Sequence, residues 1–270
     1  MTKLLGVIGD PIAHSMSPLI HNGWIRDMGF DASYEAMHVA KGAFDQALKT
    51  LSHRDLLGVN VTLPHKHVAL ASAVEASDAA TRIGAANTLT YLGQENWRAD
   101  NTDAPGFMAA LGACDPATDR ILVLGAGGSA KAVVYALCKA GHNVTVLNRT
   151  VAKAKALMDS LDIVESAYGE LSQYRDYLEH ATIVINTTSM GYGGEIIQLP
   201  FGENRLFFDI SYGKIAAPQI EHARLKNWRV RDGLSMLVAQ AAYSFEIWFG
   251  EAPDQKAALR RCRMALEAVT

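Results

Sequence analysis

Cysteine is scarce in this chain, and its placement limits what the residue can do. The 270 residues contain only three cysteines, Cys114, Cys138 and Cys262, and no two of them form a CxxC pair. This spacing argues against a disulfide framework and against a structural zinc site, so we expect no metal. A reducing compartment is expected, and the sequence therefore predicts a cytoplasmic protein.

Basic charge and long apolar runs are also lacking. The chain carries 25 Lys and Arg against 28 Asp and Glu, for a net charge of -3. With no basic surplus we expect no nucleic-acid partner. No run reaches the roughly eighteen apolar residues of a membrane span, so no membrane association is expected. The apolar start of the chain is too short for a signal peptide and is broken by Gly6 and Gly9.

Short apolar runs alternate with helix-like segments along the whole sequence. This alternation predicts βαβ units and a parallel sheet. In the first half we expect strands at Leu4–Ile8 and Gly58–Leu63 and helices at Pro18–Met28 and His65–Ala76. A second series is expected to contain strands Ile121–Leu124, Val144–Leu147, Ile183–Ile185 and Leu206–Ile210, with a helix over Ser129–Ala140.

The length and the 49% hydrophobic content allow two modest α/β domains. The segment Asp100–Pro105 is expected to join the two series. Predicted helices at Ser235–Phe249 and Asp254–Val269 follow the second series and are expected to return to the first domain. We therefore predict a discontinuous domain of residues 1–104 and 235–270 and a Rossmann-like domain of residues 105–234. A ligand cleft is expected between them, since small-molecule sites concentrate at domain interfaces.

A dinucleotide fingerprint opens the second domain. The apolar run Ile121–Leu124 leads directly into a GxGxxA pattern, and a helix-like segment follows. Gly125 would permit the tight turn, Gly127 would let the backbone approach a pyrophosphate, and Ala130 would keep the helix close to the sheet. A GxGxxA pattern alone is weak evidence, but the strand before it and the helix after it are the context that it requires. The predicted loop consists of Gly125, Ala126, Gly127, Gly128 and Ser129.

The end of the next predicted strand indicates which cofactor binds. NAD-binding sites usually have an acid there, which accepts the ribose hydroxyls. Here the residues are Asn148, Arg149 and Thr150, with Lys153 one turn further on. A guanidinium can bind a phosphate in bidentate fashion, and no carboxylate in this run would repel it. The sequence therefore predicts NADP as the cofactor.

Polar residues gather at the ends of predicted elements in the first domain. Ser15 and Ser17 alternate, so in an extended segment both hydroxyls would face one way and could hold a carboxylate. Ser17 also precedes Pro18, as a helix N-cap does, and the two roles are compatible. Asn60 and Thr62 alternate at a strand end.

Lys66 lies in the first turn of the helix that follows that strand. There the helix dipole disfavours its charge and would help it to act as an acid or base. Most lysines are simply solvated, and Asp103 and Asn87 lie where such residues usually form turns.

Seven segments together resemble the NADP-dependent shikimate dehydrogenases, and they occur in the family's order over nearly the whole chain. Several of them are weak alone, but the set is highly specific. The segments are Gly6–Pro18, Asn60–Lys66, Gly84–Thr88, Asp100–Asp103, Gly125–Ser129, Asn148–Thr150 and Asp232–Gln240.

The resemblance implies a reaction and a role for each residue. The family reduces 3-dehydroshikimate to shikimate with NADPH, reversibly, on the way to chorismate and the aromatic amino acids. Lys66 would be the acid–base residue, paired with Asp103. Ser15 and Ser17 would hold the substrate carboxylate, and Asn60, Thr62, Asn87, Asp103 and Gln240 would bind the ring hydroxyls or the lysine. Tyr212 would line the substrate side, Ile210 and Gly233 would meet the nicotinamide, and Asp78 would lie near the cofactor.

Some residues depart from the family pattern. His67 stands where an acid commonly follows the lysine, Ala86 replaces a usual valine, and residues 211–218 differ from the usual tyrosine-containing loop. These changes keep the chemistry but leave substrate preference open, so quinate or an amino-substituted shikimate is an alternative substrate. A nucleotide-binding sensor without turnover is the other alternative, although it would not need both Lys66 and Asp103. The partner is a small molecule, and a homodimer is neither predicted nor excluded.

Overall fold

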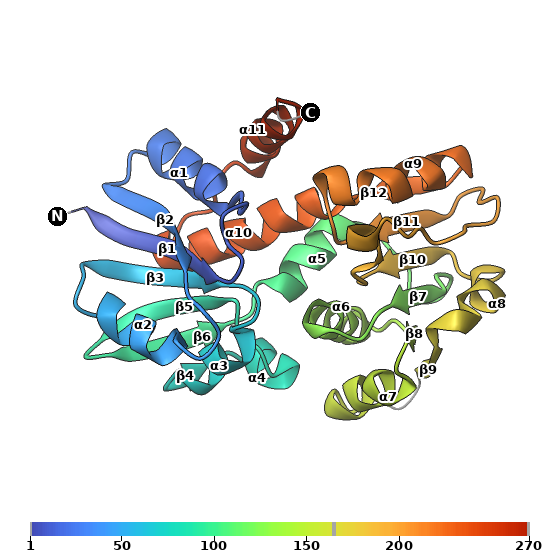
Figure 1. The fold of residues 1–270 in the computed structure, drawn as a ribbon, viewed down its shortest axis with the longest axis horizontal. Coiled ribbons are helices and arrows are strands. Elements are labelled where there is room, and N and C mark those ends of the chain that lie inside the picture. Colours follow the sequence, from blue (N-terminus) through green and yellow to red (C-terminus); the bar gives the residue numbers. More distant parts are fainter. Residues whose placement is uncertain (1, 164–165, 269–270) are drawn as a thin grey trace. The chain divides into compact units, whose positions relative to one another are not determined.

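The computed structural model describes residues 2–163 and 166–268. Val269, the expected last residue of the C-terminal helix, lies outside this part. The chain forms two compact units, one of residues 1–106 and 237–270 and the other of residues 107–236. Two helices cross the boundaries between them, α5 (Asp103–Leu111) and α10 (Gly233–Phe249) (Figure 1).

The first unit is built on a six-stranded mixed sheet with the order β2-β1-β3-β5-β6-β4. Strands β2 and β3 are parallel to β1, whereas β5 is antiparallel to both β3 and β6. The expectation of a parallel sheet is therefore wrong for this unit. The reason is the tight turn at Gly93, Gln94 and Glu95, whose positive φ angles reverse the chain into a hairpin. The strands are β1 (Lys3–Gly9), β2 (Ala32–His38), β3 (Leu56–Val61), β4 (Glu75–Ala76), β5 (Thr88–Gly93) and β6 (Asn96–Asp100).

Helices cover both faces of this sheet. On one face, α2 (Phe44–Leu51) buries Phe44, Leu48 and Leu51, which its helical period brings to one side. On the other face lie α1 (Ser17–Met28) and α10, which contribute the buried rings of Trp24 and Phe245. The remaining helices are α3 (Lys66–Ala71), α4 (Asp78–Ile83) and α11 (Gln255–Glu267).

The helix expected over His65–Ala76 is shorter than the sequence indicated. It ends at Ala71, and the residues that follow pair with β6 instead. The amide of Val74 donates to the carbonyl of Trp97, and the amide of Ser77 donates to that of Ala99. Because β6 satisfies these backbone groups, the segment forms the edge strand β4 rather than more helix.

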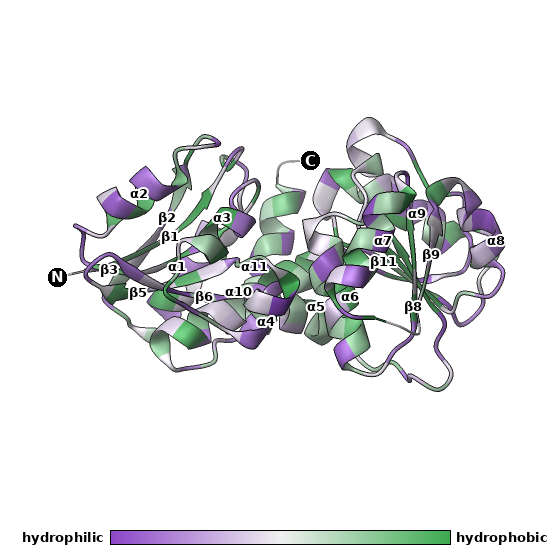
Figure 2. Cartoon of the chain, turned by 90° about the horizontal axis from the view of Figure 1, so that it is seen from below, coloured by the Kyte–Doolittle hydropathy of each residue, from purple (hydrophilic) through white to green (hydrophobic). Residues whose placement is uncertain are grey.

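The second unit has a parallel sheet, and its strand order identifies the fold. The strands run β9-β8-β7-β10-β11-β12, which is the doubly wound order 3-2-1-4-5-6. The central strands are buried on both faces and are hydrophobic except at their carboxyl ends, where Asn186 and Asp209 lie (Figure 2). The strands are β7 (Ile121–Leu124), β8 (Val144–Asn148), β9 (Ala167–Glu170), β10 (Ile183–Asn186), β11 (Leu206–Asp209) and β12 (Arg229–Arg231).

Helices α6 (Gly128–Lys139) and α7 (Val151–Ser160) contact β7, β8 and β9. A hydrophobic cluster joins alternate strand residues such as Leu122 and Phe207 to α8 (Tyr174–Leu178) and α9 (Ala217–Leu225). The strand order reverses between β7 and β10, which is where ligands of such sheets bind. Among the described residues, no helix is both long and apolar enough to span a membrane.

Candidate active site

Lys66 and Asp103 form a close ion pair in the first unit. Lys66 Nζ donates to Asp103 Oδ2 at 2.6 Å, and the two side chains are 19% and 11% exposed. Each residue opens a helix, Lys66 opening α3 and Asp103 opening α5. The start of α5 is held by Asn101, whose side-chain oxygen accepts from the amide of Asp103 at 3.1 Å. A carboxylate at a helix start is favoured by the helix dipole, whereas an ammonium there is disfavoured.

Asn87 fixes the other oxygen of that carboxylate. Its Nδ2 donates to Asp103 Oδ1 at 3.0 Å, to Thr102 Oγ1 at 2.9 Å and to Gln240 Oε1 at 3.2 Å. Its Oδ1 accepts from the amide of Thr102 at 2.7 Å. Asn87 is buried, so both ends of its amide are held by the protein. Asp103 is therefore oriented toward Lys66 by a rigid neighbour.

Asn60 forms a second buried cluster, which is continuous with the first. Its Oδ1 accepts from the hydroxyl of Tyr34 at 2.7 Å. Its Nδ2 lies 3.1 Å from the carbonyl of Asn87, 3.1 Å from Thr88 Oγ1 and 2.9 Å from Ser244 Oγ. The hydroxyl of Ser244 in turn lies 2.8 Å from that of Thr88. One hydrogen-bonded network thus links Asn60 to Asn87 and so to the ion pair.

The two serines do not lie in an extended segment, which corrects the sequence expectation. Met16 between them is in the right-handed helical region and caps α1, so Ser17 is the first helical residue and not the N-cap. The backbone turns here, and Ser15 Oγ accepts from the amide of Ser17 at 3.3 Å. This turn, and not strand alternation, brings the hydroxyl of Ser15 to the amide of Ser17.

The other expected substrate and cofactor residues of this unit lie at its element ends. Thr62 follows β3 and is half-buried against Gly9, where a Cβ would collide with the methyl group of Thr62. Gln240 is half-buried on α10, within reach of Asn87. Asp78 opens α4, is exposed, and lies 3.4 Å from Arg82 Nε.

The glycine loop of the second unit lies at the switch point of its sheet. Gly125 has φ +106° and approaches Thr187 so closely that a Cβ would collide with its hydroxyl. Gly127 and Gly128 differ, because a Cβ on either would meet no described atom within 4 Å. The fold itself does not require glycine at these two positions, and α6 has no acidic residue in its first turn. The loop thus leaves open space at a helix start, which suits a phosphate.

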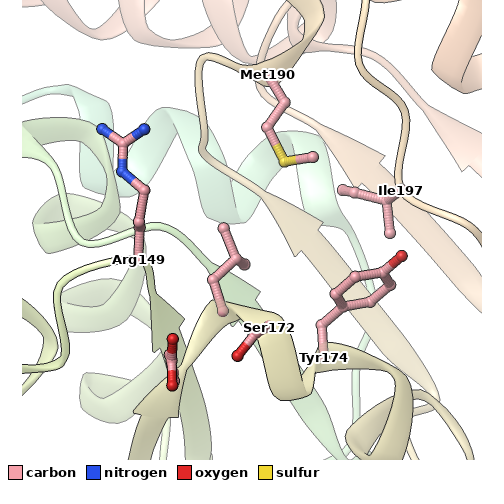
Figure 3. Close-up of a pocket in the computed structure, with 7 residues that line it drawn as sticks. Arg149, Ser172, Tyr174, Met190 and Ile197 are labelled. Carbon is pink, nitrogen blue, oxygen red and sulfur yellow. The ribbon is translucent and has the colours of Figure 1, made fainter.

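Arg149 lies exposed beyond the end of β8 and lines a pocket of the second unit. Figure 3 shows its side chain on one side of the pocket, with Met190, Tyr174 and Ile197 around the rest. Asn148 bridges this strand end to the glycine loop, since its Oδ1 accepts from the amide of Ala126 at 3.2 Å. Ser129 is half-buried at the start of α6, and Thr150 and Lys153 are exposed at the start of α7.

Ile210 and Gly233 are adjacent in the second unit. A Cβ at Gly233 would collide with the carbonyl of Ile210, and the amide of Gly233 donates to the carbonyl of Ser211 at 2.8 Å. Asp209 lies beneath this loop and accepts from the amide of Ser211 at 2.8 Å. Burial raises the pKa of Asp209 above its usual value, and its hydrogen bonds only partly offset this. Tyr212 follows, half-buried, before the short turn Gly213–Ile215.

Sequence reasoning missed several members of these networks. Two of them carried a usable signal, since His21 and Ser244 each lie four residues after a predicted site residue on a helix. Thr88, Asn101 and Thr102 lie inside two of the family segments, whereas only the fold brings Tyr34, Thr187 and Asp209 to their places. The missed residues are His21, Tyr34, Thr88, Asn101, Thr102, Thr187, Asp209 and Ser244.

Comparison with known proteins covers nearly the whole chain. Residues 7–89 match the shikimate dehydrogenase substrate binding domain, residues 110–224 the shikimate / quinate 5-dehydrogenase family, and residues 233–263 the shikimate 5'-dehydrogenase C-terminal domain. Shikimate dehydrogenase (NADP(+)) of Hyphomonas neptunium is 46% identical, over 100% of each chain. The counterpart of a Jannaschia species is 39% identical, over 97% of each. The crystal structure of shikimate 5-dehydrogenase of Thermus thermophilus in complex with NADP(H) and shikimate has a TM-score of 0.84 and 35% identity, covering 97% of this chain and 99% of that one.

Proposed function

The chain belongs to the shikimate dehydrogenase family, and we propose that it catalyses the reversible NADPH-dependent reduction of 3-dehydroshikimate to shikimate. Residues 1–104 and 235–270 form the substrate and catalytic domain in this proposal, close to the bounds of the first unit. Residues 105–234, close to the bounds of the second unit, bind the cofactor. Three cysteines without a disulfide suit a reducing compartment, and we assign the protein to the cytoplasm.

Lys66 moves the proton of the reaction. In the reductive direction its ammonium gives a proton to the oxygen of the reacting carbon, and in the oxidative direction the neutral amine takes it from the hydroxyl. Asp103, at 2.6 Å, compensates the ammonium charge and holds the side chain in one orientation. Asn87 prevents the carboxylate from turning away. The close contact of Lys66 and Asp103 is the observation that carries this proposal.

The substrate is held by the polar groups around that pair. Ser15 and Ser17 bind its carboxylate, and the turn at Met16 holds the hydroxyl of Ser15 against the amide of Ser17. Thr62, Asn87, Asp103 and Gln240 bind the ring hydroxyls. Asn60 belongs to the same set, and Tyr34, Asn87, Thr88 and Ser244 hold its amide in place. Tyr212 completes the substrate side.

The residues of the second unit fit NADP. The loop of Gly125, Ala126, Gly127, Gly128 and Ser129 suits the pyrophosphate of the cofactor. Gly127 and Gly128 leave space there that side chains would fill. Asn148, Arg149, Thr150 and Lys153 suit the 2′-phosphate, because a guanidinium and an ammonium lie exposed there. Ile210 and Gly233 line the nicotinamide end, and Asp78 belongs to the cofactor side. The bound cofactor supplies or accepts the hydride.

One assay tests this function against its alternatives. The purified protein is given NADP with shikimate, and in parallel NADP with quinate and NAD with shikimate, while reduced cofactor is followed by absorbance. We expect the highest kcat/KM for the pair of NADP and shikimate. A higher value with quinate would indicate the alternative substrate. Binding of NADP without turnover of either substrate would indicate the sensor.

A further inference from the structure

Tyr34 lies at the point where the two groups of proposed substrate ligands meet. It is buried in β2, with only 3% of its surface exposed. Its hydroxyl donates to Asn60 Oδ1 at 2.7 Å. Ser17 lies one helical turn before His21, whose ring stacks on the tyrosine ring, and its side chain partly offsets the effect of burial on the pKa of Tyr34. The phenol thus bonds Asn60 and lies beside the turn of α1 that carries Ser17.

Helix α1 holds both the backbone and the ring of Tyr34, and these contacts are called the clamp. The side chain of Asn22 accepts from the amide of Tyr34 at 2.9 Å and donates to its carbonyl at 2.8 Å. The ring of His21, one residue earlier on α1, stacks on the tyrosine ring with centroids 4.2 Å apart and planes 1° from parallel. The phenol oxygen therefore has little freedom to move. Because the same helix carries Ser17, the clamp also fixes the distance from Tyr34 to that serine.

The proton of the phenol has a defined direction. Asn60 Nδ2 faces the backbone carbonyl of Asn87, which can only accept, so the orientation of the Asn60 amide follows from its partners. Its Oδ1 then faces Tyr34 and requires a donor. Burial raises the pKa of Tyr34 well above its usual value, so the phenol keeps its proton. Since that proton goes to Asn60, the phenol oxygen can serve Ser17 only as an acceptor.

We propose that Tyr34 is a positioning residue that presets the hydroxyl of Ser17 and the amide of Asn60 for the substrate carboxylate and ring. It does not touch the reacting atoms, and it acts through these two side chains. The inference rests on the proposed function, in which Ser17 binds the carboxylate of shikimate. Without the phenol, Ser17 would rotate freely and Asn60 Oδ1 would be buried without its donor. The binding of shikimate would then carry the cost of ordering both.

The test is Tyr34→Phe, which keeps the stacked ring and removes the hydroxyl. We expect KM for shikimate to rise roughly 10- to 100-fold, kcat to change less than about threefold and KM for NADP to stay the same. The matched control is Tyr91→Phe. It removes a phenol that bonds the carbonyl of Ser52 at 3.1 Å, in the same unit and outside the network. The control should keep the wild-type constants.

Two further readouts separate positioning from a general structural effect. The first compares shikimate with its methyl ester, which lacks the carboxylate charge. We expect the ratio of kcat/KM for shikimate to that for the ester to fall in Tyr34→Phe, whereas a structural defect would lower kcat/KM equally for both substrates. The second is a double-mutant cycle with Ser17→Ala. Because Tyr34 acts through Ser17, the two losses should be markedly less than additive.

The possible failures are distinct. If the wild-type protein does not oxidise shikimate at all, the proposed function is wrong. The positioning role is wrong if the wild type is active and the folded Tyr34→Phe variant keeps its KM for shikimate. It is also wrong if kcat/KM falls equally for shikimate and its methyl ester and the double-mutant cycle is additive. Should Tyr34→Phe not fold, Asn22→Ala removes only the clamp on the backbone of Tyr34. It should raise KM in the same direction by about 3- to 10-fold, and an unchanged KM in that folded variant would overturn the proposal.

Discussion

Lys66 Nζ lies 2.6 Å from Asp103 Oδ2, although the two residues are 37 positions apart in the sequence. The pair is mostly buried and is held from behind by Asn87. Such an arrangement restrains a lysine to one place and supplies a counter-charge when it is protonated. A surface ion pair would do neither reliably, because two exposed long side chains are only weakly coupled.

Lys66→Ala should leave the fold intact and remove most of the turnover. Loss of a positioned proton donor typically lowers kcat by ~10²–10⁴-fold. Steady-state kinetics, together with circular dichroism as the folding check, measures the effect. A folded variant with nearly normal kcat would remove Lys66 from the proposed role.

Asp103→Asn should lower kcat roughly 10- to 150-fold, the usual range for one charge-assisted hydrogen bond. The new amide can accept from Asn87 or from Lys66 but would direct its own N–H groups at the other, since both neighbours donate to the native carboxylate. The pH dependence of kcat should shift as well, because the counter-charge is gone. An unchanged pH–rate profile would count against the pairing. Asp31→Asn, which alters an exposed carboxylate of the same unit without an assigned role, is the control for loss of one negative charge.

Arg149→Ala should lower the affinity for NADP far more than the affinity for NAD. The loss of a charge-assisted contact to the 2′-phosphate costs about 1.5–3 kcal/mol, or roughly 10- to 150-fold in affinity. NAD has no phosphate at that position, so its affinity should hardly change. Titration of the variant with each cofactor decides between the two roles. Equal losses for both cofactors would mean that Arg149 is structural.

The serine pair should make shikimate preferred over quinate. Quinate carries an extra hydroxyl on the carbon that bears the carboxylate, and a tight site would lose one or two hydrogen bonds to accommodate it. Each loss costs about 1–3 kcal/mol, so discrimination of roughly 10- to 1,000-fold in kcat/KM is expected. Ser15→Ala and Ser17→Ala should each raise KM for shikimate more than they lower kcat. Equal or better use of quinate by the wild type would refute this explanation.

His21→Phe should flatten the acid dependence of stability. His21 is buried, and burial lowers its pKa from 6.5 to about 3 although a contact with Asn60 opposes this effect. The unfolded chain therefore takes up a proton below pH 6.5 that the folded chain refuses. Stability is full above pH 6.5 and is lost as the pH falls toward 3, by about 2 kcal/mol at pH 5.

Phenylalanine keeps the ring that stacks on Tyr34 and cannot titrate. The free energy of unfolding, measured by denaturant titration at pH 7.5 and pH 5, should therefore differ less in the variant. His67→Phe is not a suitable control, because His67 bonds the carbonyl of Gly84 at 2.7 Å. His53→Phe alters an exposed histidine and should leave the wild-type dependence unchanged. An equal pH dependence in wild type and His21→Phe would show that His21 is not its source.

The sequence by itself determined the nucleotide half well. Strand β7 has the predicted bounds. Strands β8 and β10 differ from their predicted bounds by one residue at one end, and α6 differs by one residue at each end. These elements are predictable because a strand buried on both faces is one continuous apolar run, and because glycine marks the turn into α6. The family, the fold class and NADP were all inferred from short motifs, which depend on local backbone geometry.

The first unit was decided by its tertiary structure. The hairpin of β5 and β6 makes the sheet mixed, and pairing with β6 converts the end of an expected helix into β4. Local patterns do not reveal the formation of β4, because the strand that satisfies its backbone lies more than 20 residues away.

The same holds for the candidate site. Single residues such as Lys66 and Asn87 lie in recognisable motifs, but the buried network that orients them draws on Tyr34, which carries no local signature. A hydroxyl in a strand or on a helix acquires a role only when folding buries it beside an unsatisfied amide. That need to pair every buried polar group is a property of the assembled fold, and it is why the sequence predicted the chemistry while only the tertiary structure decided what holds it in place.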